Sequence, residues 1–99
     1  MKTFILCGGF GTRLDYEGTL IAKPMVRIGS KPILMHIIYN YIDQGHNDFV
    51  FCLGHKSNTI IDYFLKEKKK YIKILKKDKT HIKFEYKYKK NNFFGNLIY

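Results

Sequence analysis

The chain has 99 residues, of which 45% are hydrophobic and 16% aromatic, and this composition is that of one folded domain rather than a disordered chain or a multidomain protein. Residues 1–99 are therefore treated as a single domain. The formal net charge is +10, and its distribution is uneven. Residues 1–60 contribute +2 (six Lys or Arg against four Asp or Glu), whereas residues 61–99 contribute +8 (twelve against four).

Residues 3–7 form a continuous apolar run that ends at two glycines. Its length and its boundary predict a strand buried on both faces of a parallel sheet. The run is shorter than the roughly 7–15 apolar residues of a signal peptide, and no run in the chain approaches the ~20 residues of a membrane span. We therefore expect a cytoplasmic protein without a membrane partner.

The segment 8–22 has no periodic pattern and is rich in glycine, so we expect a loop there. From Pro32 onward, apolar residues at positions 33, 34, 37, 38, 41 and 42 predict an amphipathic helix that ends at Gly45. Residues 48–54 repeat the pattern of an apolar run followed by glycine, which predicts a second parallel strand. Together these elements predict a βαβ unit.

A second helix is expected to begin after Ser57 and to run into the lysines of residues 66–70, where cations suit the helix dipole. Residues 82–89 alternate apolar and charged side chains, which predicts a half-exposed strand toward an edge of the sheet. Cys7 and Cys52 lie in apolar runs, without a CxxC or His spacing, so we expect core thiols rather than a zinc site or a disulfide scaffold. His36 lies off the apolar stripe of the first helix, and we expect packing or a structural hydrogen bond from it rather than acid–base work.

The glycine-rich segment after the first strand has the composition of a phosphate-binding loop. Glycines let the backbone approach a ligand with its N–H groups exposed, and a hydroxyl and two cations stand nearby in the sequence. A nucleoside triphosphate is the ligand that uses all of these groups. The candidate residues are Gly8, Gly9, Gly11, Thr12, Arg13 and Lys23.

Two common phosphate loops are excluded by what the segment lacks. Leu14 stands where a dinucleotide fingerprint would have its third glycine, and no acid follows the second strand to hold a ribose. The chain also contains no Gly-x4-Gly-Lys-Ser/Thr string, which a P-loop requires. A dinucleotide-dependent dehydrogenase and a P-loop nucleotidase are therefore disfavoured.

The remaining pattern, Gly8-Gly9-Phe10-Gly11-Thr12-Arg13-Leu14 followed by Lys23-Pro24, resembles the N-terminal signature of the sugar-1-phosphate nucleotidyltransferases. The segment 23–37, the string Leu53-Gly54-His55-Lys56 and the segment 60–64 look like the cytidylyl branch of that family, the glucose-1-phosphate cytidylyltransferases. The resemblance implies an α/β, Rossmann-like three-layer fold. This chain would be its N-terminal portion, with parallel strands and flanking helices.

The activity that this resemblance implies is transfer of CMP from CTP to glucose 1-phosphate, which yields CDP-glucose and pyrophosphate without a covalent enzyme intermediate. Arg13 and Lys23 match the catalytic cations of the family, with Arg13 on the β- and γ-phosphates and Lys23 between the α-phosphate and the sugar phosphate. The backbone at Leu6, Gly8 and Gly9 would approach the nucleotide, and Gly11 and Thr12 would line its phosphates. Mg²⁺ is the cofactor implied.

The resemblance covers only the N-terminal part of family members. The Asp that holds Mg²⁺ in the family lies in a later segment, so this chain has no matching metal ligand and would be a truncated form with an incomplete domain. Inside the matched region, Arg27 stands where acidic residues are common in the family. Binding of the nucleotide is therefore a better supported expectation than turnover.

Three functions remain open from the sequence. The first is a cytidylyltransferase, and the second is a non-catalytic nucleotide-binding chain or a transferase of the thymidylyl, uridylyl or guanylyl type. The third is a basic nucleic-acid-binding domain, which we disfavour because residues 66–90 arrange no aromatics and cations in a known motif. Whether the chain forms a homo-oligomer also stays open, since an exposed edge strand would pair with another copy.

Overall fold

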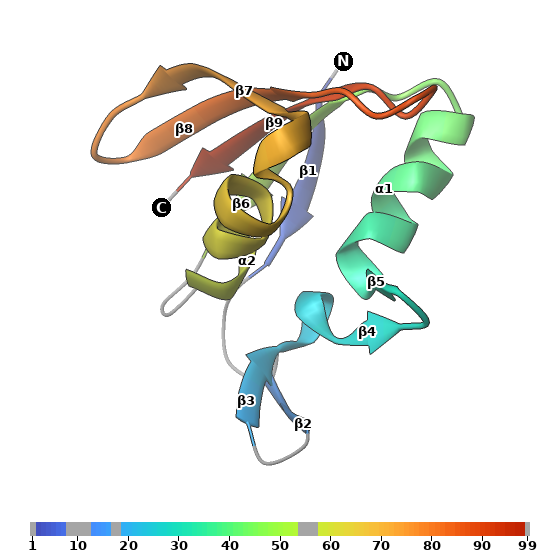
Figure 1. The fold of residues 1–99 in the computed structure, drawn as a ribbon, viewed down its shortest axis with the longest axis vertical. Coiled ribbons are helices and arrows are strands. Elements are labelled where there is room, and N and C mark those ends of the chain that lie inside the picture. The colour runs from blue at the N-terminus through green and yellow to red at the C-terminus, as the bar shows by residue number, and fades with distance from the viewer. Residues whose placement is uncertain (1, 8–12, 17–18, 54–57, 99) are drawn as a thin grey trace.

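The fold is a mixed sheet with helices packed on it, as shown by a computed structural model of the chain (Figure 1). The structure describes residues 2–7, 13–16, 19–53 and 58–98, and for residues 13–16 and 19–23 it describes the backbone alone. The expectation of an α/β fold with parallel strands and flanking helices is confirmed.

The main sheet has five strands, three of them parallel. The last two strands run antiparallel to their neighbours, so the parallel part adjoins an antiparallel meander. In spatial order the strands are β1 (Thr3–Leu6), β6 (Asp48–Cys52), β9 (Phe93–Ile98), β8 (His81–Tyr86) and β7 (Ile72–Lys77).

The predicted βαβ unit is present. Helix α1 (Ile33–Asp43) joins β1 to the parallel strand β6, and it begins directly after Pro32. Gly45 has φ +93°, a conformation that side chains disfavour, and it stops the helix where the sequence placed the end. Of the helix residues, Leu34, Met35 and Ile38 are buried.

The second helical segment is broken into three short pieces. An α-helix, α2 (Asn58–Asp62), passes into a π-helical turn, η2 (Tyr63–Glu67), and then into a 3₁₀ turn, η3 (Lys69–Tyr71). The predicted helix is confirmed over this range, although the expected cap Ser57 lies outside the described residues. No helix among the described residues is long and apolar enough to span a membrane.

Strand β1 differs from its prediction. It lies at one end of the described sheet, with β6 as its neighbour, and its side chains alternate between half-buried and exposed. Phe4 and Leu6 are 67% and 79% exposed, so the prediction of burial on both faces was wrong. An apolar run predicts side chains that avoid water, but it does not show which strands and helices cover them. Among the described residues, β6 is the one strand that pairs with β1.

The segment 8–22 is not one unbroken loop, as the sequence analysis expected. Two strands, β2 (Arg13–Tyr16) and β3 (Thr19–Ala22), pair in an antiparallel hairpin. The two-residue connection at residues 17–18 ends in glycine, a hairpin signal that the glycine-rich composition obscured. After η1 (Lys23–Met25), two further short strands, β4 (Arg27–Ile28) and β5 (Lys31–Pro32), form a second hairpin.

The predicted strand over 82–89 is β8, and its alternation is confirmed by alternating half-buried and buried side chains. It is not the edge of the sheet, because β7 lies outside it. The sequence analysis did not assign residues 72–77 to a strand, since lysines make up half of that segment.

The core is an aromatic cluster on one face of the sheet. Phe64 of η2 lies at its centre, with ring centroids 5.5 Å from Phe51 and 5.0 Å from Phe84. Phe93 extends the cluster toward Tyr86, at 4.8 Å. Because buried residues of α1, η2 and the strands β6, β8 and β9 share this cluster, it fixes the helices to the sheet.

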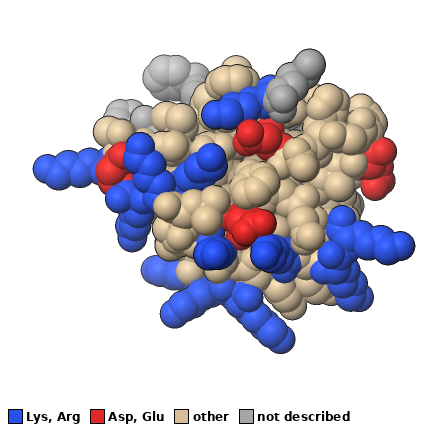
Figure 2. All heavy atoms as spheres, turned by 90° about the horizontal axis from the view of Figure 1, so that it is seen from above, with Lys and Arg blue, Asp and Glu red and all other residues tan. Residues whose placement is uncertain are grey.

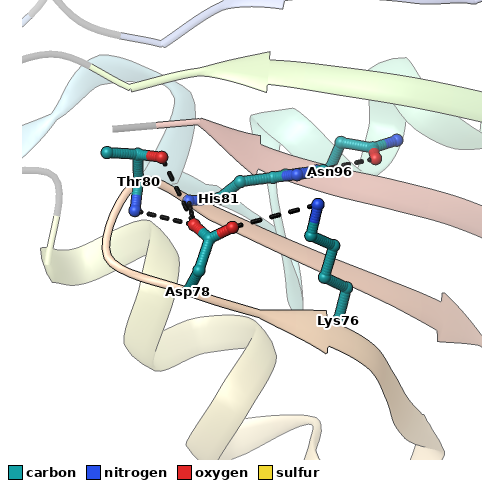
Figure 3. A network of polar contacts seen from close by, with 5 residues as sticks. All are labelled: Lys76, Asp78, Thr80, His81 and Asn96. Atoms are coloured by element: carbon teal, nitrogen blue, oxygen red, sulfur yellow. Dashed lines mark hydrogen bonds and ion pairs between the residues drawn. The ribbon is translucent and has the colours of Figure 1, made fainter.

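Asn96 of β9 is a buried polar residue, 3% exposed, and all of its polar atoms are satisfied. Its amide group donates to the carbonyl of Phe49 at 3.0 Å and to Asp48 at 3.3 Å, and its oxygen accepts from His81 Nε2 at 3.0 Å. In the turn before β8, Asp78 accepts the backbone N–H groups of Thr80 and His81 (Figure 3). The Asn96 bonds link β9 to β6 and to β8, whereas the Asp78 bonds are local to the turn between β7 and β8.

Candidate nucleotide-binding site

The predicted site residues fall at the carboxyl end of β1 and in the segments that follow it. Leu6 is the last residue of β1, Arg13 is the first residue of β2, and Lys23 is the first residue of η1. Gly8, Gly9, Gly11 and Thr12 lie outside the described residues. In Figure 1, β1 runs toward the part of the molecule that holds η1 and the β2–β3 hairpin.

The hairpin brings two of the site residues together along the backbone. Arg13 is paired with Ala22, the residue that directly precedes Lys23. Opposite residues of an antiparallel pair have Cα atoms about 4.5–5.5 Å apart. The backbones of Arg13 and Lys23 therefore lie next to each other, although nine residues separate them in the sequence, and both cations start from the same end of one hairpin.

The segment after Lys23 is anchored in the core. Met25 is only 6% exposed and belongs to the aromatic core cluster. The backbone N–H of Ile33, the first residue of α1, donates to the carbonyl of Val26 at 2.9 Å. Gly29, with φ +69°, makes the tight turn between β4 and β5. These contacts hold the backbone that follows Lys23 against the core and the start of α1.

Arg27 has a local structural role. Its Nη2 donates to both carboxylate oxygens of Glu67, each at 2.7 Å, and its Nη1 donates to the carbonyl of Ser30 at 3.1 Å. It also lies over the ring of Tyr63, 5.9 Å from the centroid. The pair connects β4 to η2 across forty residues, and sequence reasoning missed it because nothing in a linear pattern relates positions 27 and 67.

A surface hollow of about 520 Å³ lies between this segment and the α2–η2 helix. Its lining mixes cations, carboxylates and an aromatic ring, and the cations Arg27 and Lys66 pair with Glu67 and Asp62. Burial and the Glu67 carboxylate raise the pKa of Tyr63 far above its usual range, so its hydroxyl stays protonated. The lining includes Met25, Arg27, Asn58, Asp62, Tyr63 and Glu67.

The thiol of Cys7 is not a nucleophile. It is 1% exposed, and burial, with a smaller contribution from nearby Cys52, raises its pKa to about 12. A protonated, buried thiol does not attack a phosphate or a disulfide. Both cysteines are free: Cys7 is a core thiol as expected, whereas Cys52 is half-buried.

Two further predictions concern the role of His36 and the ligands of a metal ion. His36 Nε2 lies 2.9 Å from the carbonyl oxygen of Ile28, which confirms the expected structural hydrogen bond. Within the described ranges, no three His, Cys, Asp or Glu side chains gather as a metal site would require.

Much of the basic excess lies on the surface around the meander and the η2–η3 helix. Figure 2 shows Lys and Arg side chains gathered over the left and lower parts of one face, with Asp and Glu side chains near its centre. Several of these ammonium groups lie over tyrosine rings, as Lys68 and Lys70 do at about 6 Å from the Tyr71 centroid. Such contacts account for part of the lysine content through packing along aromatic surface.

Parallel strands joined by a helix, with further strands beside them, define an α/β protein. The family model described as "Nucleotidyl transferase" matches residues 2–92. The chain belongs to the nucleotidyl transferase family.

The chain is similar to the glucose-1-phosphate cytidylyltransferase of Salmonella typhimurium, with 52% identity over 64 residues, or 65% of this chain and 25% of that protein. A probable glucose-1-phosphate cytidylyltransferase of Bacillus subtilis is 49% identical over 65 residues, covering 66% and 26%. The mannose-1-phosphate guanyltransferase of Schizosaccharomyces pombe is 34% identical over 71 residues, covering 72% and 20%. No solved structure gives a significant match.

These matches cover a limited part of the relatives. The chain spans about a quarter of the length of the cytidylyltransferases and a fifth of the guanyltransferase. What the matches establish is membership in a family of nucleotidyltransferases, not the substrates of this chain.

Proposed function

We propose that this chain carries the nucleotide half of a cytidylyltransferase site and binds CTP. The observation that supports this most is the pairing of Arg13 with Ala22, which brings the backbone of Arg13 close to that of Lys23, the other cation of the family signature. A triphosphate carries several negative charges, and two adjacent cations with a glycine-rich backbone match it. The similarity to cytidylyltransferases supports CTP over other nucleotides.

In this proposal the residues have separate roles. Arg13 offers a planar fork of donors that suits two oxygens of the β- and γ-phosphates, and Lys23 offers a compact charge to the α-phosphate. The backbone of Leu6, Gly8 and Gly9 approaches the nucleotide, and Gly11 and Thr12 contact its phosphates. Cys7 takes no part, because its thiol is buried and protonated at neutral pH.

The complete reaction would join the phosphate oxygen of glucose 1-phosphate to the α-phosphorus of CTP and release pyrophosphate. Mg²⁺ would supply charge neutralisation when bound, but the described residues contain no ligand cluster for it. We therefore assign the chain a part in CMP transfer that ends at binding and positioning CTP. The acceptor sugar phosphate belongs to the same proposal and rests on the similarity to the cytidylyltransferases.

Calorimetric titration of the chain with CTP tests the proposal, with GTP as the comparison because guanyltransferases are also similar. We expect CTP to bind more tightly than GTP and Lys23→Ala to weaken CTP binding at least tenfold, about 1.4 kcal/mol. Lys79→Ala, which removes an exposed lysine in the turn before β8, is the matched control and should leave the affinity unchanged. If both variants weaken CTP binding equally, general attraction between the basic chain and the nucleotide accounts for the binding.

Turnover is tested separately by measuring pyrophosphate release with CTP, glucose 1-phosphate and Mg²⁺. We expect no release from this chain alone, because the metal-binding acid implied by the family resemblance has no counterpart in it. Sustained release would show that other residues hold the metal and would replace the binding role with a complete transferase.

A further inference from the structure

The hairpin formed by β4 and β5 is too small to fix its own position. Each strand has two residues, and even a longer isolated pair of strands is only marginally stable in water. The position of the hairpin therefore depends on the elements that it contacts. Helix α1, which begins directly after β5, supplies several of these contacts.

Two carbonyl groups of the β4 segment are held from the first part of α1. The carbonyl of Val26, which directly precedes β4, accepts the N–H of Ile33 at 2.9 Å. The carbonyl oxygen of Ile28 lies 2.9 Å from His36 Nε2. Because a carbonyl oxygen only accepts, Nε2 carries the proton and donates it to this bond. His36 is thus a side chain that closes β4 against α1.

The ion pair of Arg27 with Glu67 ties the same hairpin to η2 instead. It orders two long side chains, both more than two-fifths exposed, and the loss of their conformational entropy offsets much of the attraction. The imidazole of His36 has fewer rotatable bonds to order, and its base is fixed on a helix. We therefore expect the bond to α1 to hold the hairpin more firmly than the ion pair to η2.

The hairpin is closely linked to Lys23 along the backbone. Lys23 begins η1, and only Pro24 and Met25 separate it from Val26. Proline has a fixed φ, and the side chain of Met25 is buried in the core cluster. Few backbone rotations therefore remain between Lys23 and β4, so a displacement of β4 is transmitted to Lys23.

We propose that His36 is a positioning residue of the nucleotide site. Its bond to the Ile28 carbonyl keeps β4 on α1 and thereby keeps Lys23 where it meets the α-phosphate. The inference rests on the proposed function, because it takes CTP as the ligand of Lys23, and His36 itself does not contact the nucleotide. Release of the hairpin is a local opening, and a nucleotide that binds only the closed form shifts the equilibrium toward it.

Hydrogen exchange of the Ile33 amide measures this opening in the full chain without nucleotide, since that N–H is bonded to Val26 when the hairpin is closed. His36→Leu should speed the exchange about two- to tenfold, the effect of losing one neutral hydrogen bond. His36→Gln sets an N–H donor where Nε2 stands and should restore the rate, whereas the shorter His36→Asn should not. Asn40→Leu, at an exposed position one turn further along α1, is the matched control and should leave the rate unchanged.

The coupling to the site is tested by adding CTP. At ten times its dissociation constant, CTP should slow exchange of the Ile33 amide in the wild-type chain about tenfold, because the nucleotide binds the closed form. Calorimetric titration should show CTP binding at least twofold weaker in His36→Leu and restored in His36→Gln. A bond with a purely structural role would change the exchange rate but would give neither protection by CTP nor a change in affinity.

The outcomes separate this inference from the proposed function. If CTP binds but the exchange of Ile33 stays unchanged, or if His36→Leu exchanges and binds CTP like the wild type, the inference is overturned while the proposed function stands. Failure of His36→Gln to restore the CTP affinity would also overturn it. If the wild-type chain binds no CTP, the proposed function fails, and the inference fails with it.

Discussion

The segment that carries the ligand-binding signature and the rest of the chain are built differently. Residues 13–32 form two short hairpins, and Met25 is their one described side chain in the aromatic core cluster. Residues 33–53 and 58–98 supply nearly all of the remaining cluster. Among the described side chains, the segment 13–32 therefore contributes little to the core cluster, and we expect the proposed binding residues to contribute little to stability. Substitutions in the two regions should therefore have separable effects.

The largest effect is expected at the centre of the core. Phe64 is fully buried and contacts rings from β6, β8 and β9. Phe64→Ala should lower the free energy of unfolding by about 3–5 kcal/mol, because it removes buried area and leaves a cavity. Denaturant titration followed by circular dichroism measures the loss. A change below 1 kcal/mol would mean that this cluster is not the core.

In the binding segment, Arg13→Ala should weaken CTP binding by about 1.5–3 kcal/mol, or roughly 10- to 150-fold, the range for hydrogen bonds to charged groups. The unfolding free energy should change little, because the side chain belongs to a hairpin outside the sheet. Arg13→Lys keeps the charge but loses the bidentate geometry, so it should give an intermediate affinity. If the lysine variant binds as tightly as the wild type, charge alone accounts for the role of Arg13.

Gly95 of β9 tests the packing of the sheet. A Cβ atom built on this residue would collide with the ring of Phe84, which covers it from β8. Gly95→Ala should therefore cost about 1–3 kcal/mol of unfolding free energy through overpacking. Pairing it with Phe84→Leu, which makes room, should recover part of the loss. If the losses of unfolding free energy in the two single variants simply add in the double variant, the contact between residue 95 and the Phe84 ring is not the cause of the loss.

The smallest effect is expected for the ion pair between Arg27 and Glu67. Both side chains are more than two-fifths exposed, so Arg27→Ala should cost about 0–1 kcal/mol despite the short contacts between the two groups. Calorimetric melting checks this value, and CTP binding should remain within about twofold of the wild type. A tenfold loss of CTP affinity in Arg27→Ala would show that the ion pair holds the Lys23 segment in position. The effects of the two regions on stability and on binding would then not be separable.

The sequence predicted the elements whose signals are local. The βαβ unit, the stop of α1 at Gly45 and the alternation of β8 follow from periodicity and glycine placement. The edge position of β1 was not predictable, because an apolar run carries no information about neighbours. Strand β7 was missed because its lysines resemble a solvated loop, although their side chains extend from an edge strand.

The candidate site was predicted by motif and residue chemistry, and the structure adds how two of its residues come together. The order Gly-x-Gly-Thr-Arg, then Lys-Pro, identified Arg13 and Lys23, but their adjacency depends on a hairpin that the sequence analysis took for a loop. The ion pair of Arg27 with Glu67 depends on tertiary packing and has no linear signal. That ion pair gives a structural reason for the arginine at position 27, which departs from the family pattern.

The central claim, that residues 8–13 and Lys23 hold CTP, is tested most directly by recording the backbone amide spectrum of the chain during a CTP titration. We predict saturable shifts of the amides of residues 8–13 and of Lys23, with the amides of β7 and β8 unchanged, and loss of these shifts in Arg13→Ala. Shifts confined to the lysine-rich segment 66–90 that vanish as salt is raised would contradict the claim, because they would assign the binding to the basic surface instead.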